Sequence, residues 1–214
     1  MDFSNRLLFI CKMNSNKGKY RADSHRADWW DYSVAAAYFI TICTKNMQHF
    51  FGSIDSDLLQ VNHQLSEIGE IAQNEWIKTP DIRSDMNLFL GEFVVMPNHF
   101  HAIICIGSNQ FNVNSSRDTM PRVENSELKN NSGNVAKHRD GTGNQKRFGA
   151  QSKNLASIIR GYKSSVTKKA RQLNPDFAWQ ANYYDRIIRN EYEYERIAEY
   201  IQNNPMNWGK DKFR

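Results

Sequence analysis

Two apolar runs separated by a two-residue turn constrain the fold of this chain more than any other feature. Residues 86–96 (MNLFLGEFVVM) and 99–106 (HFHAIICI) are rich in the β-branched and aromatic side chains that favour strands. Only Pro97 and Asn98 lie between them, and both residue types are frequent in turns. The two runs therefore predict neighbouring strands that form an antiparallel hairpin within one sheet.

Other apolar patterns predict two more strands and three helices. Residues 34–44 (VAAAYFITICT) predict a buried strand, and a short strand is expected within residues 178–188. Apolar residues at helical spacing predict helices over residues 64–78 and 154–172, and from about 190 to 203. This order predicts an α+β fold: a ferredoxin-like βαββαβ antiparallel sheet with helices on one face, an open second face, and an additional C-terminal helix.

The length of 214 residues suits one domain that carries an insertion. Residues 1–32 are mixed and basic and are interpreted as an N-terminal arm, and residues 33–214 as the domain. Between about 107 and 152, Asn, Ser, Gly, Lys and Arg dominate. Such a segment cannot bury enough apolar surface to offset the entropy lost on ordering, so we expect a flexible insertion. Both the arm and the insertion could contact DNA or could simply be solvated.

The net charge of +5 and the pI of about 9.1 favour a polyanionic partner such as nucleic acid, although solubility alone accounts for them equally well. The three cysteines show no CxxC pairing, which argues against a disulfide scaffold or a zinc knuckle and fits a reducing cytoplasm. No apolar run approaches the length of a membrane span, and residues 7–11 are too short for the core of a signal peptide. We therefore expect a cytoplasmic protein with no membrane partner.

The sequence His99-Phe100-His101 lies in the second strand of the predicted hairpin. Residues two apart on a strand point to the same side, so both imidazoles would share one face while Phe100 enters the core. Two such imidazoles can bind one divalent ion. The alternative is a pair of polar side chains on a wet sheet face. A histidine-triad hydrolase is excluded because Ile103 stands where that chemistry needs a third histidine.

Tyr200 and Asn204 are four residues apart in the last predicted helix and so share a face. A tyrosine beside a cation can attack a phosphodiester, because the cation favours its phenolate form. The Asn204 amide oxygen could serve as a third metal ligand. Position on a helix alone favours a packing role for Tyr200, and this alternative stays open from the residues.

Several blocks of the sequence resemble the REP-associated tyrosine transposases, which are HUH single-tyrosine nucleases (U is a bulky apolar residue). Two blocks carry most of the resemblance, VVMPNHFHAII (94–104) and NYYDRIIRNEYEYERIAEYIQNNP (182–205). YFITICT (38–44) and GEIAQNEW (69–76) also resemble the first strand and first helix of that family. The resemblance covers most of residues 32–208 but not the insertion, and the order of the blocks makes it specific.

The resemblance implies a metal-dependent transesterase that nicks and rejoins single-stranded DNA during transposition. His99 and His101 would hold Mg²⁺ or Mn²⁺, with Asn204 as third ligand. Tyr200 would be the nucleophile that forms a 5′-phosphotyrosine, and a second strand would then attack this adduct. The resemblance also implies DNA with imperfect palindromic hairpins as the partner, and a monomer more often than a dimer.

Several other residues are candidates for DNA contact, although they belong to no catalytic motif. Trp179 and Trp208 could stack on bases, although burial is expected for Trp179. Tyr192 is the weaker rival nucleophile. Tyr183 and Tyr184 are interpreted as packing or DNA-contacting residues, and Tyr194 as a packing residue. Five cations could neutralise backbone phosphates: Lys163, Lys168, Lys169, Arg186 and Arg189.

Two other functions remain as alternatives. A domesticated, non-catalytic nucleic-acid-binding protein would keep the fold and lose the reaction, and a metal-dependent phosphoesterase would use water in place of Tyr200. An RNA-recognition module shares the βαββαβ order, but residues 90–98 (LGEFVVMPN) lack its aromatic signature.

Overall fold

The computed structural model describes residues 30–57, 60–112 and 152–210. The predicted N-terminal arm (1–32) and insertion (about 107–152) therefore lie almost entirely outside the described residues.

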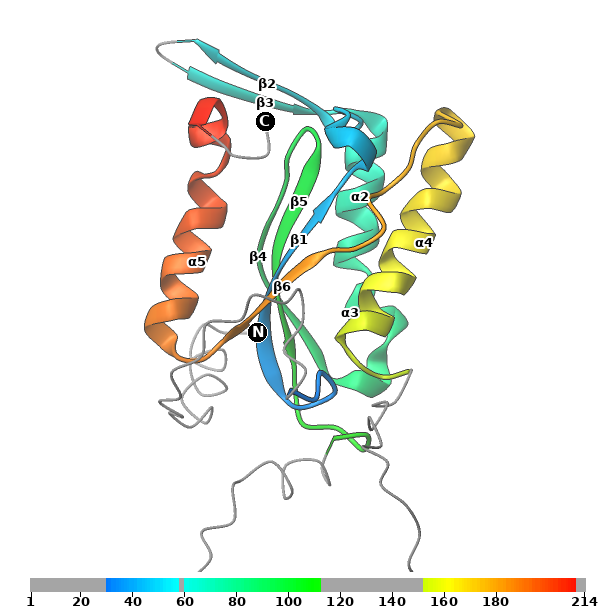
Figure 1. The fold of residues 1–214 in the computed structure, drawn as a ribbon, viewed down its shortest axis with the longest axis vertical. Coiled ribbons are helices and arrows are strands. Elements are labelled where there is room, and N and C mark those ends of the chain that lie inside the picture. Colours follow the sequence, from blue (N-terminus) through cyan, green and yellow to red (C-terminus); the bar gives the residue numbers. More distant parts are fainter. Residues whose placement is uncertain (1–29, 58–59, 113–151, 211–214) are drawn as a thin grey trace, which may run out of the picture.

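Four strands form one sheet in the order β4-β5-β1-β6, and every neighbouring pair is antiparallel (Figure 1). This confirms the predicted α+β class and the hairpin of β4 and β5. The predicted strand within 178–188 is shorter than expected, because the chain before Tyr184 joins β1 only through a single bridge between Thr44 and Trp179. The strands are β1 (Ala36–Cys43), β4 (Leu88–Val95), β5 (His99–Ile106) and β6 (Tyr184–Ile188).

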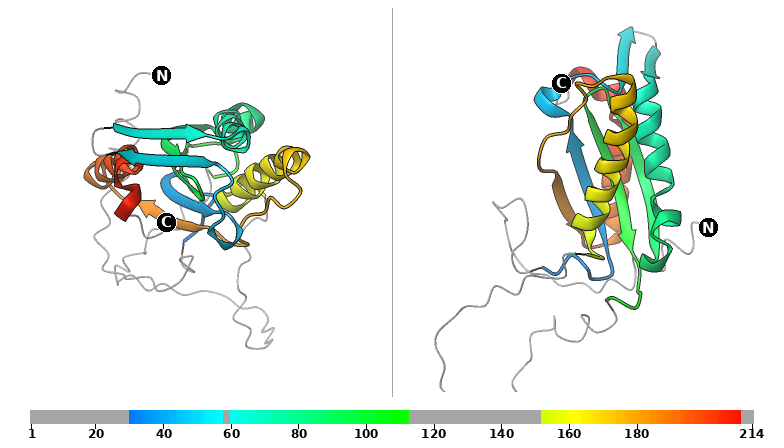
Figure 2. Two further views of the ribbon diagram at one scale, coloured as in Figure 1. Left: turned by 90° about the horizontal axis from the view of Figure 1, so that it is seen from above. Right: turned by 90° about the vertical axis from the view of Figure 1, so that its right-hand side faces the viewer.

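One face of the sheet is covered by helices α2 (Glu67–Ile77) and α4 (Leu155–Leu173), with the short α3 (Thr79–Ile82) beside them (Figures 1 and 2). Both long helices start at a side-chain cap, since Ser66 accepts from the Gly69 amide and Asn154 forms a capping box with Ser157. The predicted start of α2 at residue 64 is wrong. Residues 60–65 form a strand instead, and the Ser66 cap fixes the helix start after it.

The core on this face is built from interlocking aromatic rings. Phe100 of β5 lies between Trp76 of α2 and Tyr162 of α4, with ring centroids 5.1 and 5.4 Å away. The Tyr162 hydroxyl donates to the Ala72 carbonyl at 3.1 Å, and burial raises the pKa of this phenol well above its ordinary value. The inward direction predicted for Phe100 is therefore confirmed.

Helix α5 (Glu191–Asn203), capped by Asn190, packs against the second face of the sheet. Ile197 and Ile201 are four residues apart and bury their side chains in a cluster that includes Phe39 and Ile103. Figure 2 shows α5 on the opposite side of the sheet from α2 and α4. The expectation that this face is open is thus wrong in part, because α5 covers the region that Ile103 lines.

A two-stranded hairpin of β2 (Gly52–Asp57) and β3 (Gln60–Leu65) crosses the end of the main sheet (Figure 1). It contacts the 3₁₀ segment η4 (Pro205–Lys210), and Ile54 packs with Met96 and Trp208. Gly52 is required at its base, because its φ is 140° and a Cβ there would lie 2.1 Å from the Gln64 carbonyl oxygen. Sequence patterns did not predict this hairpin.

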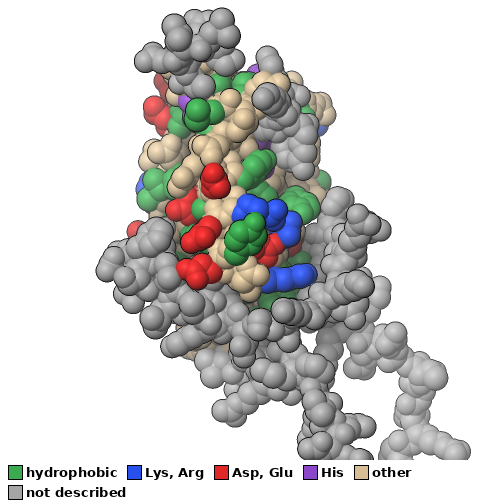
Figure 3. All heavy atoms as spheres, turned by 90° about the vertical axis from the view of Figure 1, so that its left-hand side faces the viewer, with side chains coloured by type: hydrophobic (Ala, Val, Ile, Leu, Met, Phe, Trp, Pro, Cys, Tyr) green, Lys and Arg blue, Asp and Glu red, His purple; other side chains and the backbone are tan. Residues whose placement is uncertain are grey.

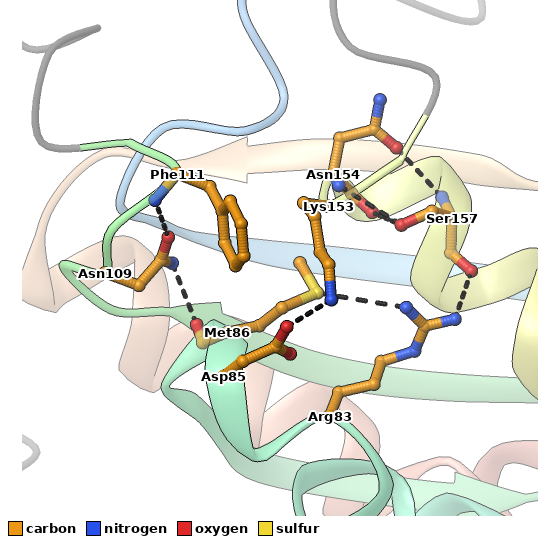
Figure 4. A network of polar contacts seen from close by, with 8 residues as sticks. All are labelled: Arg83, Asp85, Met86, Asn109, Phe111, Lys153, Asn154 and Ser157. Carbon is orange, nitrogen blue, oxygen red and sulfur yellow. Dashed lines mark hydrogen bonds and ion pairs between the residues drawn. The ribbon is translucent and has the colours of Figure 1, made fainter.

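Both ends of the predicted insertion lie at the opposite end of the sheet from His99. Figure 4 shows the polar contacts that hold them there. On the leaving side, Nδ2 of the Asn109 side chain donates to the Met86 carbonyl at 3.0 Å. On the returning side, Lys153 forms an ion pair with Asp85 and its ammonium lies 5.0 Å from the ring centroid of Phe111. The two ends are therefore neighbours in space. Among the described residues, no helix combines the length and apolar character that crossing a membrane requires.

Candidate active site

The two histidines of β5 point to the face that α5 covers. His99 is paired with Cys43 and His101 with Thr41 across the β1–β5 ladder. Their ring centroids are 4.5 Å apart, and the residues are 0% and 1% exposed. The prediction that both imidazoles share one face is confirmed. Their burial argues against the alternative of two polar side chains on a wet surface.

Each imidazole has its Nδ1 atom held by a neighbouring polar side chain. Nδ1 of His99 is 2.8 Å from Oδ1 of Asn98, and Nδ1 of His101 is 2.8 Å from the Thr41 hydroxyl. An amide oxygen only accepts, so the contact with Asn98 places the proton of neutral His99 on Nδ1. Nε2 of His99 is then the nitrogen that can coordinate a cation. Sequence reasoning assigned Asn98 only to the turn and did not single out Thr41.

Tyr200 of α5 reaches the histidine pair from the other end of the chain. Its hydroxyl lies 3.3 Å from Nε2 of His101, and its ring meets that of Phe39 edge-on at 6.2 Å between centroids. Tyr200 is 43% exposed, so a ligand in solvent can reach it. The fold therefore brings together His101 and Tyr200, which sequence reasoning had paired across 99 residues.

Asn204 lies one turn after Tyr200 and caps the C-terminal end of α5. It is 3% exposed, and within the described part of the chain its Oδ1 atom has no hydrogen-bond partner. A buried polar atom left in this way costs about 1–3 kcal/mol. A hydrogen-bond donor or a cation would therefore be stabilised next to this oxygen.

The donor set fits a divalent ion. Imidazole nitrogens and an amide oxygen are ligands that such ions accept. The described residues contain no group of three or more His, Cys, Asp or Glu that could hold a metal. The predicted ligands His99, His101 and Asn204 would instead offer two imidazole nitrogens and one amide oxygen.

Trp208 is buried and belongs to the wall of the site. Its ring centroid lies 6.1 Å from that of His99 and 5.6 Å from that of His49. The suggestion that Trp208 stacks on bases is contradicted, because only 4% of the residue is exposed. His49 was missed by sequence reasoning, since it lies in a short polar stretch without a motif.

The other candidate tyrosines differ from Tyr200 in their surroundings. Tyr192 is 76% exposed and lies eight residues before Tyr200, about 12 Å along the axis of α5. The Tyr194 hydroxyl donates to Glu92 at 3.1 Å, and Tyr183 packs against the core. Tyr184 is half-exposed on β6, and Thr41 lies between it and His101 in the sheet.

The five predicted DNA-contacting cations are not gathered at Tyr200. Lys169 forms an ion pair with the buried Glu75 at 2.6 Å, and Arg186 pairs with Glu193 of α5. The exposed Arg189 follows β6. Lys163 and Lys168 line a hollow beside α4. On the α5 side, acidic and basic side chains lie next to one another (Figure 3), so this side is not uniformly basic.

The chain was compared with known proteins. No family model matches it. An uncharacterized protein of Haemophilus influenzae is 34% identical over 198 residues, which cover 92% of this chain and 95% of the relative. The two proteins belong to one family.

Two solved structures that match the chain have lower sequence identity. One is a REP-associated tyrosine transposase bound to a REP hairpin, which is 17% identical with a TM-score of 0.47 and covers 91% of this chain and 76% of that one. Another is a candidate transposase from Deinococcus radiodurans, which is 14% identical with a TM-score of 0.35 and covers 88% of this chain and 97% of that one.

Proposed function

We propose that this family member is a metal-dependent transesterase that nicks and rejoins single-stranded DNA in a transposition reaction. The observation that carries the proposal is a contact of 3.3 Å between the hydroxyl of Tyr200, a half-exposed residue, and Nε2 of the buried His101. A second buried imidazole, that of His99, lies beside His101. The order β4-β5-β1-β6 supports a ferredoxin-like platform for this site. The motif resemblance over residues 94–104 and 182–205 supports the same chemistry.

Tyr200 is the nucleophile in this proposal. Its phenolic oxygen forms a bond to the phosphorus of a phosphodiester, and the bond from phosphorus to the 3′ oxygen breaks. The phenolic proton passes to solvent, and the leaving oxygen takes a proton and becomes a 3′-hydroxyl. The DNA segment downstream of the cleaved bond stays attached to Tyr200 through its 5′ phosphate, as a 5′-phosphotyrosine. A 3′-hydroxyl of a second strand then attacks the adduct and releases Tyr200, so the number of phosphoester bonds is unchanged.

His99, His101 and Asn204 would hold Mg²⁺ or Mn²⁺, which would polarise the phosphate as a Lewis acid and favour the phenolate. Asn98 and Thr41 keep the two imidazoles in orientation through their Nδ1 atoms. Phe39 limits the movement of the Tyr200 ring. Burial of the histidines excludes water from one side of the reacting phosphate.

Trapping of the covalent adduct tests this proposal. Labelled single-stranded oligonucleotides with hairpins from near the gene are incubated with the protein and Mg²⁺ or Mn²⁺, and the products are separated on a denaturing gel. We expect a metal-dependent shifted band that disappears with Tyr200→Phe. Tyr192→Phe is the matched control, because it removes an exposed hydroxyl from the same helix and should leave the band unchanged.

Other outcomes would favour the alternatives. Cleavage without an adduct would favour a phosphoesterase that uses water. Binding to several hairpins without cleavage, with either metal, would favour a domesticated binding protein. A band that survives Tyr200→Phe would assign the nucleophile to another tyrosine.

A further inference from the structure

A shallow hollow of about 580 Å³ lies between α4 and the segment that precedes β6. Its lining contains no Asp or Glu among the described residues. It is formed mainly by three cations, two hydroxyl side chains and an indole: Lys163, Lys168, Arg171, Ser164, Thr167 and Trp179. The positive charges suit a phosphate group, the Thr167 hydroxyl donates to the Lys163 carbonyl at 2.7 Å, and the indole offers a surface for a sugar or a base.

Two of the cations are held in place by the backbone. The Lys163 ammonium donates to the carbonyls of Gln180 and Ala181 at 2.6 and 3.1 Å, and Nε of Arg171 donates to the Phe177 carbonyl at 3.0 Å. Burial lowers the pKa of Lys163, which indicates a cation that has lost part of its hydration. An anion in the hollow would therefore meet positive charge that is already positioned.

The third cation, Lys168, is exposed to solvent. Lys168 of α4 lines the hollow and has no ion-pair partner among the residues that the structure describes. The next residue, Lys169, differs because it pairs with the buried Glu75 on the side of α4 that faces α2. Lys168 is thus the residue whose charge can be removed with the smallest effect on packing.

The hollow lies on the α4 side of the sheet and the histidine pair on the α5 side, and the backbone of β1 connects the two. The Gln180 amide donates to the Cys43 carbonyl at 2.9 Å, and Cys43 is the residue paired with His99 across the β1–β5 ladder. Segment 179–181 therefore runs along β1 beyond the end of β6. A DNA strand that leaves Tyr200 across this edge of the sheet would meet Lys168 and Trp179.

We propose that this hollow binds a backbone phosphate of the same DNA strand that presents its scissile phosphate to Tyr200. The statement that the same strand presents its scissile phosphate to Tyr200 rests on the proposed function. Binding of a single strand in the hollow does not, because it can occur whether or not Tyr200 reacts.

The salt dependence of DNA binding tests the hollow directly. Binding of labelled oligothymidylate is measured over a range of salt concentrations with Tyr200→Phe protein, which cannot react. Adding Lys168→Gln should lower the slope of log K against log salt by about 0.7, the value for one phosphate contact on a single strand. Arg160→Gln is the matched control, because it removes one exposed positive charge from the same helix outside the hollow. The control should leave the slope unchanged.

A second measurement links the hollow to the reaction. Single phosphates of an adduct-forming oligonucleotide are replaced in turn by uncharged methylphosphonates. One replacement near the scissile position should weaken binding by Tyr200→Phe protein and have no effect once Lys168→Gln is present. If the slopes for Lys168→Gln and Arg160→Gln are equal, the hollow is not a phosphate site, whatever the adduct gel shows. If the slope falls as expected but no adduct forms, the hollow is supported and the tyrosine mechanism is overturned.

Discussion

The imidazole of His101 has a different partner at each nitrogen, the Thr41 hydroxyl at Nδ1 and Tyr200 at Nε2. Thr41→Val removes the hydroxyl with little change in volume. Loss of such an outer contact typically weakens a metal site by about 10–100-fold. We expect the Mn²⁺ concentration that gives half-maximal adduct formation to rise by that factor.

Thr79→Val is the matched control for Thr41→Val. The Thr79 hydroxyl donates to the Glu75 carbonyl on the other side of the sheet. A similar Mn²⁺ requirement for the two variants would show that Thr41 has no special role in the site.

Asn204 allows the metal to be tested without any DNA. A ligand at 100 times its dissociation constant stabilises the folded state by about 2.7 kcal/mol. Mn²⁺ should therefore raise the melting temperature of the protein, and Asn204→Leu should remove this increase. Without metal, Asn204→Leu should be as stable as the parent or more so, because it replaces a buried oxygen that has no hydrogen-bond partner in the described part of the chain. An equal increase for the two proteins would exclude Asn204 as a ligand.

At the scale of elements, Glu75 joins α2 to α4. It is 5% exposed and forms contacts with Lys169 and Ser165 of α4. Burial alone would raise the pKa of this carboxyl, but the hydrogen bonds from Lys169 and Ser165 outweigh burial, and the pKa is lowered. The carboxylate thus stabilises the fold above its ordinary pKa of about 4.5, and this contribution is lost as the pH falls through the lowered value in the folded state.

Glu75→Gln should therefore lower the free energy of unfolding at neutral pH by about 1–3 kcal/mol. The difference from the parent should shrink at acidic pH, where the parent loses the same charge. Urea unfolding followed by tryptophan fluorescence at several pH values measures both effects. Glu70→Gln on the exposed side of α2 should show neither.

Apolar periodicity predicted the strands of the main sheet and the helices α4 and α5, because each buries a continuous face. It failed for β2 and β3, in which polar residues such as Asp55 and Asn62 face each other across a hairpin that lies outside the sheet. For the candidate site, the spacing of His99 and His101 predicted their shared face. The roles of Thr41 and His49 could not be predicted, since these contacts arise from strand register and from the path of η4.

At the scale of the whole molecule, His101 and Tyr200 meet within one chain. We therefore expect each chain to react alone, as the monomer prediction requires. Mixing Tyr200→Phe with His101→Ala protein tests this, because a site shared between two chains would regain a complete set of residues in a mixed dimer. The mixture should form no adduct, and recovery of the adduct would demonstrate a site shared between subunits.

Residues 109–112 and 153–154 are each anchored to the domain by their own contacts, and not only by the chain that connects them. A single peptide-bond cut between them would separate the histidines and Tyr200 into two fragments. The contacts that join these fragments do not depend on the cut peptide bond. Strand β6 of the second fragment still pairs with β1 of the first, and α4 still packs on α2. The protein is therefore suited to a split form, in which the histidine fragment and the tyrosine fragment are produced separately and combine to restore the site.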